Sequence, residues 1–315
     1  MIDSMSAGAS SASQAVTRGL VSVVVPTRDR SQLLEQALEA MSSQSYASLE
    51  VIVVDDGSVD GTAEVIRAAA GRDPRIRGIR QPRSSGAAVA RNAGAAVARG
   101  EFLLFEDDDC RGSRTRIADL VAALESNSSA AYAYCWMQVI EGGRATEVRG
   151  QLGPWSIGTP YALIRAEAFR RAGGFDPELA RLQDFDLWTR LLHEGSAVRV
   201  PTVLFTTLRN GAGISASSEH LRAAAGRLLD KYRDAELSRP HLAQMHRILG
   251  GRLIVEGMRV EALAHYRRSI RLRPWSARSW VGCALAALGS PVYRRAAELQ
   301  SAVARALAPR VGSSR

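Results

Sequence analysis

The stretch FLLFEDDDC, residues 102–110, is the key to the fold, because a short apolar run ends directly in four consecutive acids. Four adjacent carboxylates repel one another, and a partly buried cluster needs a compensating cation. Mg²⁺ or Mn²⁺ is the usual compensator where oxygen ligands dominate. A solvated acidic turn that merely ends a strand is the alternative, and this stretch alone leaves both interpretations open.

Two apolar runs upstream end in a similar way. They are VSVVVPT (21–27) and LEVIVVDDGS (49–58). Between the first of these runs and residue 100, the periodicity predicts helices at 31–41, 62–71 and 85–100 and a weaker strand at 76–80. Gly71 and Gly100 are expected to end the second and the third of these helices. Strands that alternate with helices and lack a polar face predict a parallel sheet covered on both sides.

The acidic strand endings predict where a ligand binds. In an open parallel sheet, ligands lie beyond the carboxyl ends of the strands. The endings read PTRDR (26–30), DDGS (55–58) and EDDD (106–109), so we expect three polar loops to converge on one edge. Each ending alone is equally well explained as a turn or a helix cap.

The composition changes after Ser218, where strand signals vanish and Arg, Leu and Ala recur at helical spacing. We therefore predict three parts: a disordered Ser/Ala tail at 1–19, an α/β domain at 20–217 and a helical region at 218–315. Residues 243–290 resemble the tetratricopeptide pattern. The positions that match it are Leu249, Gly250, Gly257, Ala262, Tyr266, Pro274 and Trp280, whereas His246 replaces the expected Trp.

The bulk composition restricts the class of protein. The chain has 315 residues, 46% of them hydrophobic, and contains no apolar run of the roughly 18 residues that a membrane helix needs. Its N-terminus lacks the apolar region of a secretory signal, and its three cysteines show no metal-ligand spacing, which predicts a cytoplasmic protein. The net charge of +9 is compatible with phosphorylated small molecules, anionic glycans or an anionic membrane surface.

Taken in order, four motifs resemble family 2 glycosyltransferases, which have the GT-A nucleotide-binding fold. They are VSVVVPTRDR, LEVIVVDDGSVDGT, SSGAAVARNAGAAVARGEFLLFEDDD and GGFDPELARLQDFDLWTRLLHEG. The resemblance covers residues 20–215, about two thirds of the chain. It implies a GT-A α/β fold with a mostly parallel central sheet, followed by an all-α C-terminal region. It also implies a nucleoside-diphosphate-sugar donor and Mn²⁺ or Mg²⁺ as cofactor.

The resemblance also implies roles for individual residues. Asp55 would bind the nucleobase, Asp108 would contact the ribose or the metal, and Asp109 would ligate the metal. The remaining positions expected in the nucleotide site are Pro26, Thr27, Asp29, Asp56, Gly57, Arg83 and Arg91. Arg83 and Arg91 are equally well explained as solvated helix-face residues. Of the other acids in the cluster, Glu106 matches an acid common in the family, and Asp107 is expected to point to solvent.

The motif LQDFDLWTRL implies that Asp184 is the base that deprotonates the acceptor hydroxyl. An N-cap for the helix that follows is the alternative role for Asp184. Asp186 would face the helix interior or cap its start. Two positions depart from the family: Gln183 stands where an acid usually precedes the base, and Asn210 where many relatives have His.

These features predict an inverting glycosyltransferase that uses a UDP-sugar, with a thymidine nucleotide as the alternative donor. The acceptor is a hydroxyl of a glycan, lipid or secondary metabolite. A nucleotidyltransferase would need a glycine-rich, lysine-bearing loop after the first strand, and a dinucleotide dehydrogenase would need G-x-G-x-x-G there; the sequence has neither. An inactive nucleotide-sugar-binding scaffold that acts through its helical tail is the remaining alternative. The tail could bind a protein partner, self-associate or lie on the inner membrane face, and no nucleic-acid partner is expected.

Overall fold

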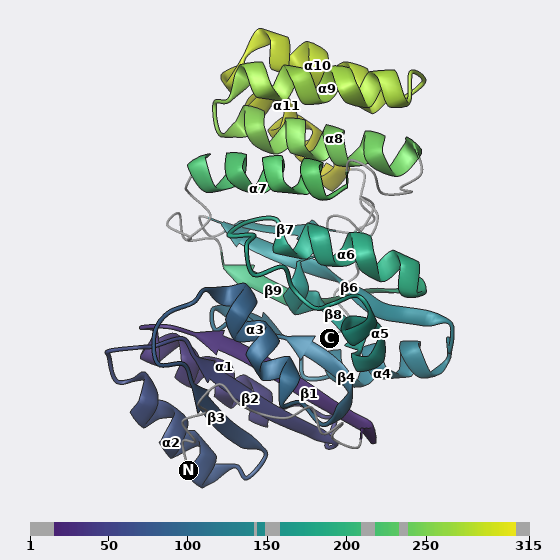
Figure 1. The fold of residues 1–315 in the computed structure, drawn as a ribbon. Helices are drawn as coiled ribbons and strands as arrows, with labels where there is room; N and C mark the ends of the chain where they lie inside the picture. Colours follow the sequence, from purple (N-terminus) through teal and green to yellow (C-terminus); the bar gives the residue numbers. More distant parts are fainter. Residues whose placement is uncertain (1–15, 142–143, 149–157, 209–217, 233–238, 307–315) are drawn as a thin grey trace. The chain divides into compact units, whose positions relative to one another are not determined.

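The computed structural model describes residues 16–141, 144–148, 158–208, 218–232 and 239–306 (Figure 1). These residues form two compact units, one that ends at Leu208 and one that begins at Ser218. The first unit is a mixed α/β structure and the second is entirely helical in its described part. The predicted fold class is therefore confirmed.

The first half of the sheet is parallel. Its strands are, in spatial order, β3 (Ile76–Arg80), β2 (Leu49–Asp55), β1 (Thr17–Thr27) and β4 (Gly100–Phe105). The connecting helices are α1 (Ser31–Ser42), α2 (Thr62–Arg72) and α3 (Ala87–Ala96). Because all four strands run in the same direction, their carboxyl ends lie along one edge of the sheet.

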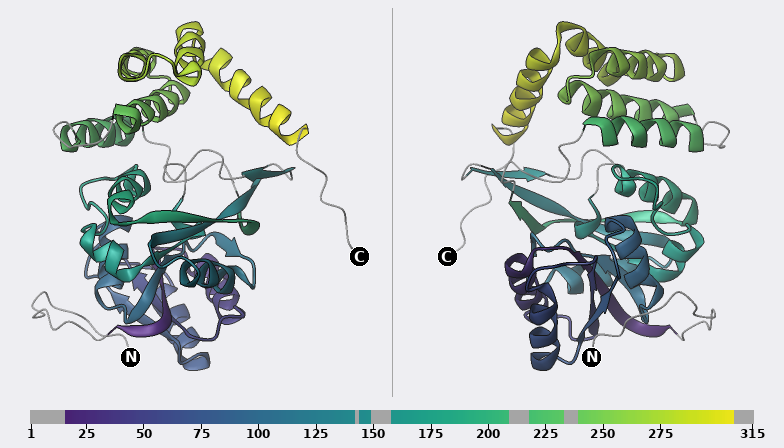
Figure 2. Two further views of the ribbon diagram at one scale, coloured as in Figure 1. Left: turned by 90° about the vertical axis from the view of Figure 1, so that its right-hand side faces the viewer. Right: turned by 60° about the vertical axis from the view of Figure 1, so that its left-hand side comes forward.

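Helices cover both faces of this half, which is why its strands are apolar throughout (Figures 1 and 2). Val23 and Val25 of β1 pack against α1, α2 and α4 (Arg116–Glu125). Val24, between them, packs on the opposite face against α3, α5 (Ala166–Arg171) and α6 (Gln183–Glu194). All three valines are fully buried, and each contributes about 2 kcal/mol of transfer free energy.

The second half of the sheet is mixed. Its strands continue from β4 in the order β8 (Ala162–Arg165), β6 (Ala130–Glu141), β9 (Ser196–Leu208) and β5 (Cys110–Gly112), with β7 (Arg144–Val148) paired to β6. Strand β8 is antiparallel to β4 and follows a short 3₁₀ turn, η2 (Thr159–Tyr161). Strands β6 and β9 are parallel to each other. The sequence analysis did not predict this half.

Three predicted boundaries are wrong. Strand β1 begins at Thr17, three residues before the predicted domain start. Gly100 does not end a helix; it is the first residue of β4. Glycine is needed at this position for a steric reason, because a Cβ would lie 2.6 Å from the carbonyl oxygen of Leu20. Gly71 lies inside α2, which ends one residue later because the Asp73 side chain accepts the backbone N–H of Arg75 (3.0 Å) and begins a turn.

The second unit consists of α7 (Ser218–Lys231), α8 (Arg239–Val255), α9 (Arg259–Leu272), α10 (Ala277–Leu288) and α11 (Ser290–Ala306). The buried ring of Tyr266 fills the space above two glycines, since a Cβ at Gly250 or Gly282 would lie within 3.0 Å of it. Leu249 and Ala262 are also fully buried, whereas the Trp280 side chain is 56% exposed. The likeness to a tetratricopeptide pair stays a prediction. In the described part of the chain, no helix has the length and apolar character required to cross a bilayer.

Candidate active site

Backbone and side-chain hydrogen bonds join the three strand endings. The Asp56 N–H donates to the Thr27 carbonyl (2.9 Å), and the Gln81 N–H donates to the Asp55 carbonyl (2.9 Å). The Thr27 hydroxyl donates to Asp108 Oδ2 (2.8 Å), which links the end of β1 to the acidic loop after β4. The expected convergence of the three loops on one edge is therefore confirmed.

Asp55 offers a buried acceptor at this edge. Its carboxylate is almost fully buried, and Oδ1 accepts the N–H of Ser58 (2.8 Å). Among the described residues, Oδ2 has no hydrogen-bond partner, and its nearest cation is Arg80, whose Nε lies 3.6 Å away. A buried carboxylate oxygen without a donor is costly unless a ligand supplies one.

Asp29 holds the loop after β1 against the loop after β2. Its N–H donates to the Ser58 hydroxyl (3.0 Å), and its Oδ1 accepts the Val59 N–H (2.7 Å). Asp29 has a φ of 52°, a left-handed conformation that is uncommon outside glycine. These contacts assign Asp29 a structural task at the predicted nucleotide pocket. Pro26, one of the predicted nucleotide-site positions, lies in β1 opposite Val54.

Asp56 anchors the loop that leads into α3. Its two oxygens accept from the Ser84 hydroxyl (2.8 Å), the Ser85 N–H (2.8 Å) and the Gly86 N–H (3.0 Å). Gly57 has a φ of 75°, and a Cβ there would lie 2.9 Å from the Ser84 nitrogen, so only glycine fits between the two loops. Arg83 precedes this contact and its side chain is exposed.

Arg30 neutralises two of the acids that follow β4. Its Nη1 donates to Asp108 Oδ1 (2.7 Å) and to Asp109 Oδ2 (3.1 Å). The hydrogen bond to Asp108 raises the pKa of Arg30, while burial raises the pKa of the Asp108 carboxyl despite its two donors. The sequence did not predict a role for Arg30, although it is the second arginine of PTRDR and lies three residues after the end of β1.

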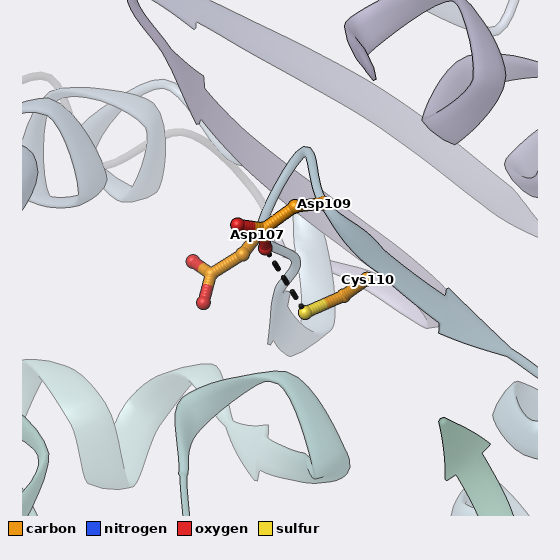
Figure 3. Close-up of side chains that lie close together, drawn as sticks. All are labelled: Asp107, Asp109 and Cys110. Carbon is orange, nitrogen blue, oxygen red and sulfur yellow. Dashed lines mark hydrogen bonds between the residues drawn. The ribbon is translucent and has the colours of Figure 1, made fainter. Parts of the chain in front are cut away.

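Asp107, Asp109 and Cys110 form the group best suited to a metal among the described residues (Figure 3). One potential ligand atom from each lies within 4.8 Å of the others. Burial raises the pKa of the Cys110 thiol, so the thiol stays protonated and the two carboxylates are the usable ligands. Two carboxylates at the predicted nucleotide pocket are the kind of oxygen ligands that Mg²⁺ or Mn²⁺ prefers. Cys110 is a buried thiol packed beside the acids.

The other two acids of the cluster have separate roles. Glu106 is fully buried in an ion pair with Arg116, and burial raises the pKa of Glu106 to about 7. Arg116 also donates to the Pro160 carbonyl (2.7 Å), so this pair holds β4 to η2. The prediction that Asp107 points to solvent is wrong, because its Oδ1 accepts from Arg91 Nη2 (2.6 Å) and its side chain is only 34% exposed.

Arg91 links the acidic loop to the start of α6. Besides Asp107, it donates through Nη1 to the Gln183 side chain (3.1 Å). Asp184, the next residue, is therefore held near the acidic loop. An amide at position 183 accepts one hydrogen bond from Arg91 without competing for its charge, which leaves the ion pair with Asp107 intact.

Asp184 lies in the first turn of α6. The N-cap is Leu182, which has a φ of 64°, so the alternative interpretation of Asp184 as the N-cap is wrong. Asp184 Oδ1 accepts the N–H of Phe185 (2.8 Å). Asp186 is fully buried and accepts two hydrogen bonds from Arg190, which gives it a structural role in the helix.

Some predictions fall elsewhere. Asn210, which departs from the family pattern, lies outside the described residues. In the helical unit, the Nδ1 atoms of His246 and His265 lie 3.2 Å apart. A hollow of about 520 Å³ lies between α1, α2 and residues 73–76. None of the predicted site residues lines it, so we place the candidate site at the acidic edge.

Comparison with protein families and curated relatives identifies the first unit. Residues 22–177 match the model of glycosyl transferase family 2. The chain is 30% identical over 190 residues to the putative colanic acid biosynthesis glycosyl transferase WcaA of Escherichia coli, covering 56% of this chain and 67% of that protein. It is 29% identical over 187 residues to the putative glycosyltransferase EpsE of Bacillus subtilis, and the match covers 56% of this chain and 67% of EpsE.

The succinoglycan biosynthesis protein ExoA of Rhizobium meliloti is 27% identical over 187 residues, and the chain covers 57% of it. The chain thus spans about two thirds or less of these relatives.

Solved structures show the same fold. The mannosyltransferase PcManGT of Pyrobaculum calidifontis, in complex with GDP-Man and Mn²⁺, superposes with a TM-score of 0.58 at 21% identity, covering 93% of this chain and 82% of that one. S. aureus TarS 1–349 in complex with UDP-GlcNAc has a TM-score of 0.58 at 17% identity, with shares of 88% and 92%. The motif order, the sheet with its acidic edge and the match over residues 22–177 agree, and the chain belongs to glycosyltransferase family 2.

Proposed function

We propose that this chain is an inverting, metal-dependent glycosyltransferase that transfers a hexose from a nucleoside-diphosphate sugar to an acceptor hydroxyl. The main observation in support is that three features meet at one edge of the sheet. They are the buried acceptor oxygen of Asp55, the carboxylates of Asp107 and Asp109, and the start of α6 with Asp184, which Arg91 links to the acidic loop. Glycosyl transfer needs recognition of the donor's nucleobase, neutralisation of its diphosphate and a general base that deprotonates the acceptor. This edge has a group for each.

Asp184 acts as the base in this proposal. The acceptor oxygen forms a bond to the anomeric carbon as the bond from that carbon to the diphosphate oxygen breaks. The acceptor proton passes to the Asp184 carboxylate, and the nucleoside diphosphate leaves with the electron pair. One displacement inverts the anomeric configuration. No second carboxylate is required as a nucleophile, in contrast to retaining glycosidases.

Asp109 and Asp107 would hold the divalent ion. When bound, a cation at this place stabilises the negative charge that develops on the departing diphosphate. Arg30 neutralises Asp108 and Asp109, so an ion that binds Asp109 Oδ2 would compete with Arg30 for this oxygen. The freed guanidinium would then face the diphosphate, for which its planar set of donors is well suited.

The donor base is proposed to be uracil, with thymine as the alternative. Both rings carry an N–H that can donate to Asp55 Oδ2 between two carbonyl acceptors. TarS is described with UDP-GlcNAc and PcManGT with GDP-Man, so relatives of this fold bind different bases. WcaA and ExoA are named for colanic acid and succinoglycan biosynthesis, which supports a polysaccharide or its precursor as acceptor.

The test is the release of nucleoside diphosphate from UDP-, TDP- and GDP-sugars in the presence of Mn²⁺, Mg²⁺ or EDTA. We expect turnover of one uridine or thymidine donor that EDTA abolishes. Isothermal titration of UDP measures binding separately. Binding of UDP without turnover of any donor, with glycan and lipid-linked acceptors supplied, would favour the inactive scaffold. Absence of both would refute the proposal.

A further inference from the structure

Helix α10 leaves an apolar face uncovered within the helical unit. Its buried positions are Ser279, Gly282 and Ala286, spaced three and four residues apart. The exposed positions of the helix are Arg278 and six apolar residues: Ala277, Trp280, Val281, Ala284, Ala287 and Leu288. A helix that faces water normally carries polar residues on that side. Helix α10 instead carries apolar residues almost all round.

Two tryptophans make this face larger. Trp275, just before the helix, is 91% exposed, and Trp280 is 56% exposed. The Trp280 indole N–H donates to the Pro274 carbonyl (2.8 Å), so its polar atom is satisfied while its ring stays outside. Exposed large apolar residues that gather in one place mark an interaction site. We call Trp275, Trp280, Val281 and Leu288 the α10 face.

Three exposed arginines lie close to the α10 face in the sequence. Arg271 and Arg273 lie at the end of α9, and Arg278 lies at the flank of α10; all three side chains are exposed. In the part of the chain that the structure describes, no ion pair uses any of the three. The segment 259–288, which spans α9, the connection and α10, carries six arginines and one acid: Arg259, Arg267, Arg268, Arg271, Arg273, Arg278 and Glu261.

This charge distribution discriminates between occupants. A second copy of the same face would bring two sets of arginines together, and like charges across an interface are costly. An anionic bilayer attracts the arginines and also offers an interfacial layer in which tryptophan rings are favourable. An apolar stripe with tryptophans and an arginine-rich flank is the pattern of helices that lie in a membrane interface.

We propose that the α10 face docks on the surface of an anionic phospholipid bilayer, with Arg271, Arg273 and Arg278 contacting lipid headgroups. The inference rests only on the helical unit and does not require the proposed glycosyl transfer. It would, however, bring the chain to a surface where lipid-borne hydroxyl acceptors are concentrated. Docking of this kind is peripheral and reversible, since it inserts side chains and no spanning helix.

The test is sedimentation of the full-length chain with vesicles of phosphatidylcholine, with and without phosphatidylglycerol. We expect binding only to the vesicles that contain phosphatidylglycerol, and weaker binding at high salt. Replacing the three arginines by glutamine should weaken binding by roughly 100-fold, since each contributes on the order of a factor of five near an anionic surface. The double variant Trp275→Ser and Trp280→Ser should also lose most binding.

Matched controls separate this face from general charge and hydrophobicity. The triple variant Arg67→Gln, Arg72→Gln and Arg170→Gln removes the same charge from exposed arginines of the first unit. Val260→Ser removes an exposed apolar side chain of α9. Both controls should bind vesicles as the unchanged chain does, and circular dichroism should show equal helicity for all variants.

Three outcomes would overturn the proposal: no vesicle binding, equal binding to neutral vesicles, or equal loss in the controls. Sedimentation equilibrium gives a fourth. If the chain dimerises and the Trp275→Ser and Trp280→Ser variant is monomeric, a second copy covers the α10 face and the bilayer does not.

Discussion

The acidic edge of the sheet and the α10 face concentrate opposite kinds of side chain. At the edge, four consecutive acids lie at the end of a buried strand, and all four pair with an arginine: Glu106 with Arg116, Asp107 with Arg91, and both Asp108 and Asp109 with Arg30. On α10, apolar side chains are exposed and the arginines beside them have no acidic partner among the described residues.

The difference lies in what each region still lacks. The four acids at the edge already have arginine partners, so a metal ion competes with Arg30 for Asp109. Asp55 Oδ2 is the exception, since it has no hydrogen-bond donor among the described residues. The apolar area on α10 is exposed to water. A partner that covers it gains about 25 cal/mol of free energy per Å² removed from water. The edge is therefore suited to a selective reaction, and the α10 face to association.

The largest expected effect is at the edge. Asp184→Asn should lower kcat by roughly 10²- to 10⁴-fold, because an amide cannot accept the acceptor's proton. Steady-state release of nucleoside diphosphate measures it. The matched control is Asp119→Asn on α4, which packs on the opposite face of the sheet from α6. An Asp184→Asn variant that keeps kcat within a factor of three would remove this residue as the base.

The next effect concerns stability. Arg116→Met leaves the Glu106 carboxylate buried without its cation and should lower the free energy of unfolding by about 3–5 kcal/mol. Urea denaturation at neutral pH measures this. Adding Glu106→Gln to the Arg116→Met variant should recover part of the loss. By contrast, Asp109→Asn, at a half-exposed position, should change stability by less than about 0.5 kcal/mol. Equal losses would mean that the four acids do not differ in burial as described.

A smaller effect is expected for Arg30. In the absence of a nucleotide-sugar donor, the Arg30→Ala variant should bind Mn²⁺ roughly tenfold more tightly than the unchanged chain, because no internal cation then competes for Asp109. Isothermal titration with Mn²⁺ alone measures the affinity. Arg30→Lys keeps the charge and should bind close to the unchanged chain. Weaker Mn²⁺ binding in Arg30→Ala would show that Arg30 supports the site instead of competing for it.

The smallest effect is a pH dependence of the helical unit. Burial lowers the pKa of His246 to about 4, and the positive charges of His265 and Arg268 lower it further. Burial also lowers the pKa of His265, an effect that the nearby Glu261 partly offsets. The folded state therefore binds fewer protons than the unfolded state between pH 4 and about 6.5, so stability falls as the pH is lowered through this range.

Thermal unfolding of the helices, followed by circular dichroism at pH 7 and pH 5, measures the change. We expect a lower midpoint at pH 5. In His246→Gln with His265→Gln the difference should shrink. An unchanged difference in that variant would assign the pH dependence to other groups.

Sequence reasoning predicted the parallel half of the sheet well, and for a physical reason. Apolar runs such as VSVVV and LEVIVV need cover on both faces, and strands joined by helices run in parallel, so their polar endings must meet at one edge. The convergence of Thr27, Asp55 and Asp108 follows from that rule, without knowledge of any contact. The antiparallel pairing of β8 with β4 follows from no local pattern, because it joins segments about 60 residues apart.

The individual roles of the acids were less predictable. The residues from Glu106 to Asp109 are alike in sequence, yet one is fully buried, one is almost half-exposed and three have different arginine partners. Each partner comes from another element: Arg30 follows β1, Arg91 lies on α3 and Arg116 begins α4. Which acid meets which cation depends on how these elements pack.

The sequence by itself determined the fold class, the family and the sheet edge at which the candidate site lies, because apolar periodicity and strand-ending residues are local properties. Only the tertiary structure decided that Asp107 pairs with Arg91, that Arg30 bridges Asp108 and Asp109, and that the exposed side of α10 is its apolar one. These depend on contacts between residues distant along the chain, since burial and pairing are set by which surfaces the neighbouring elements cover.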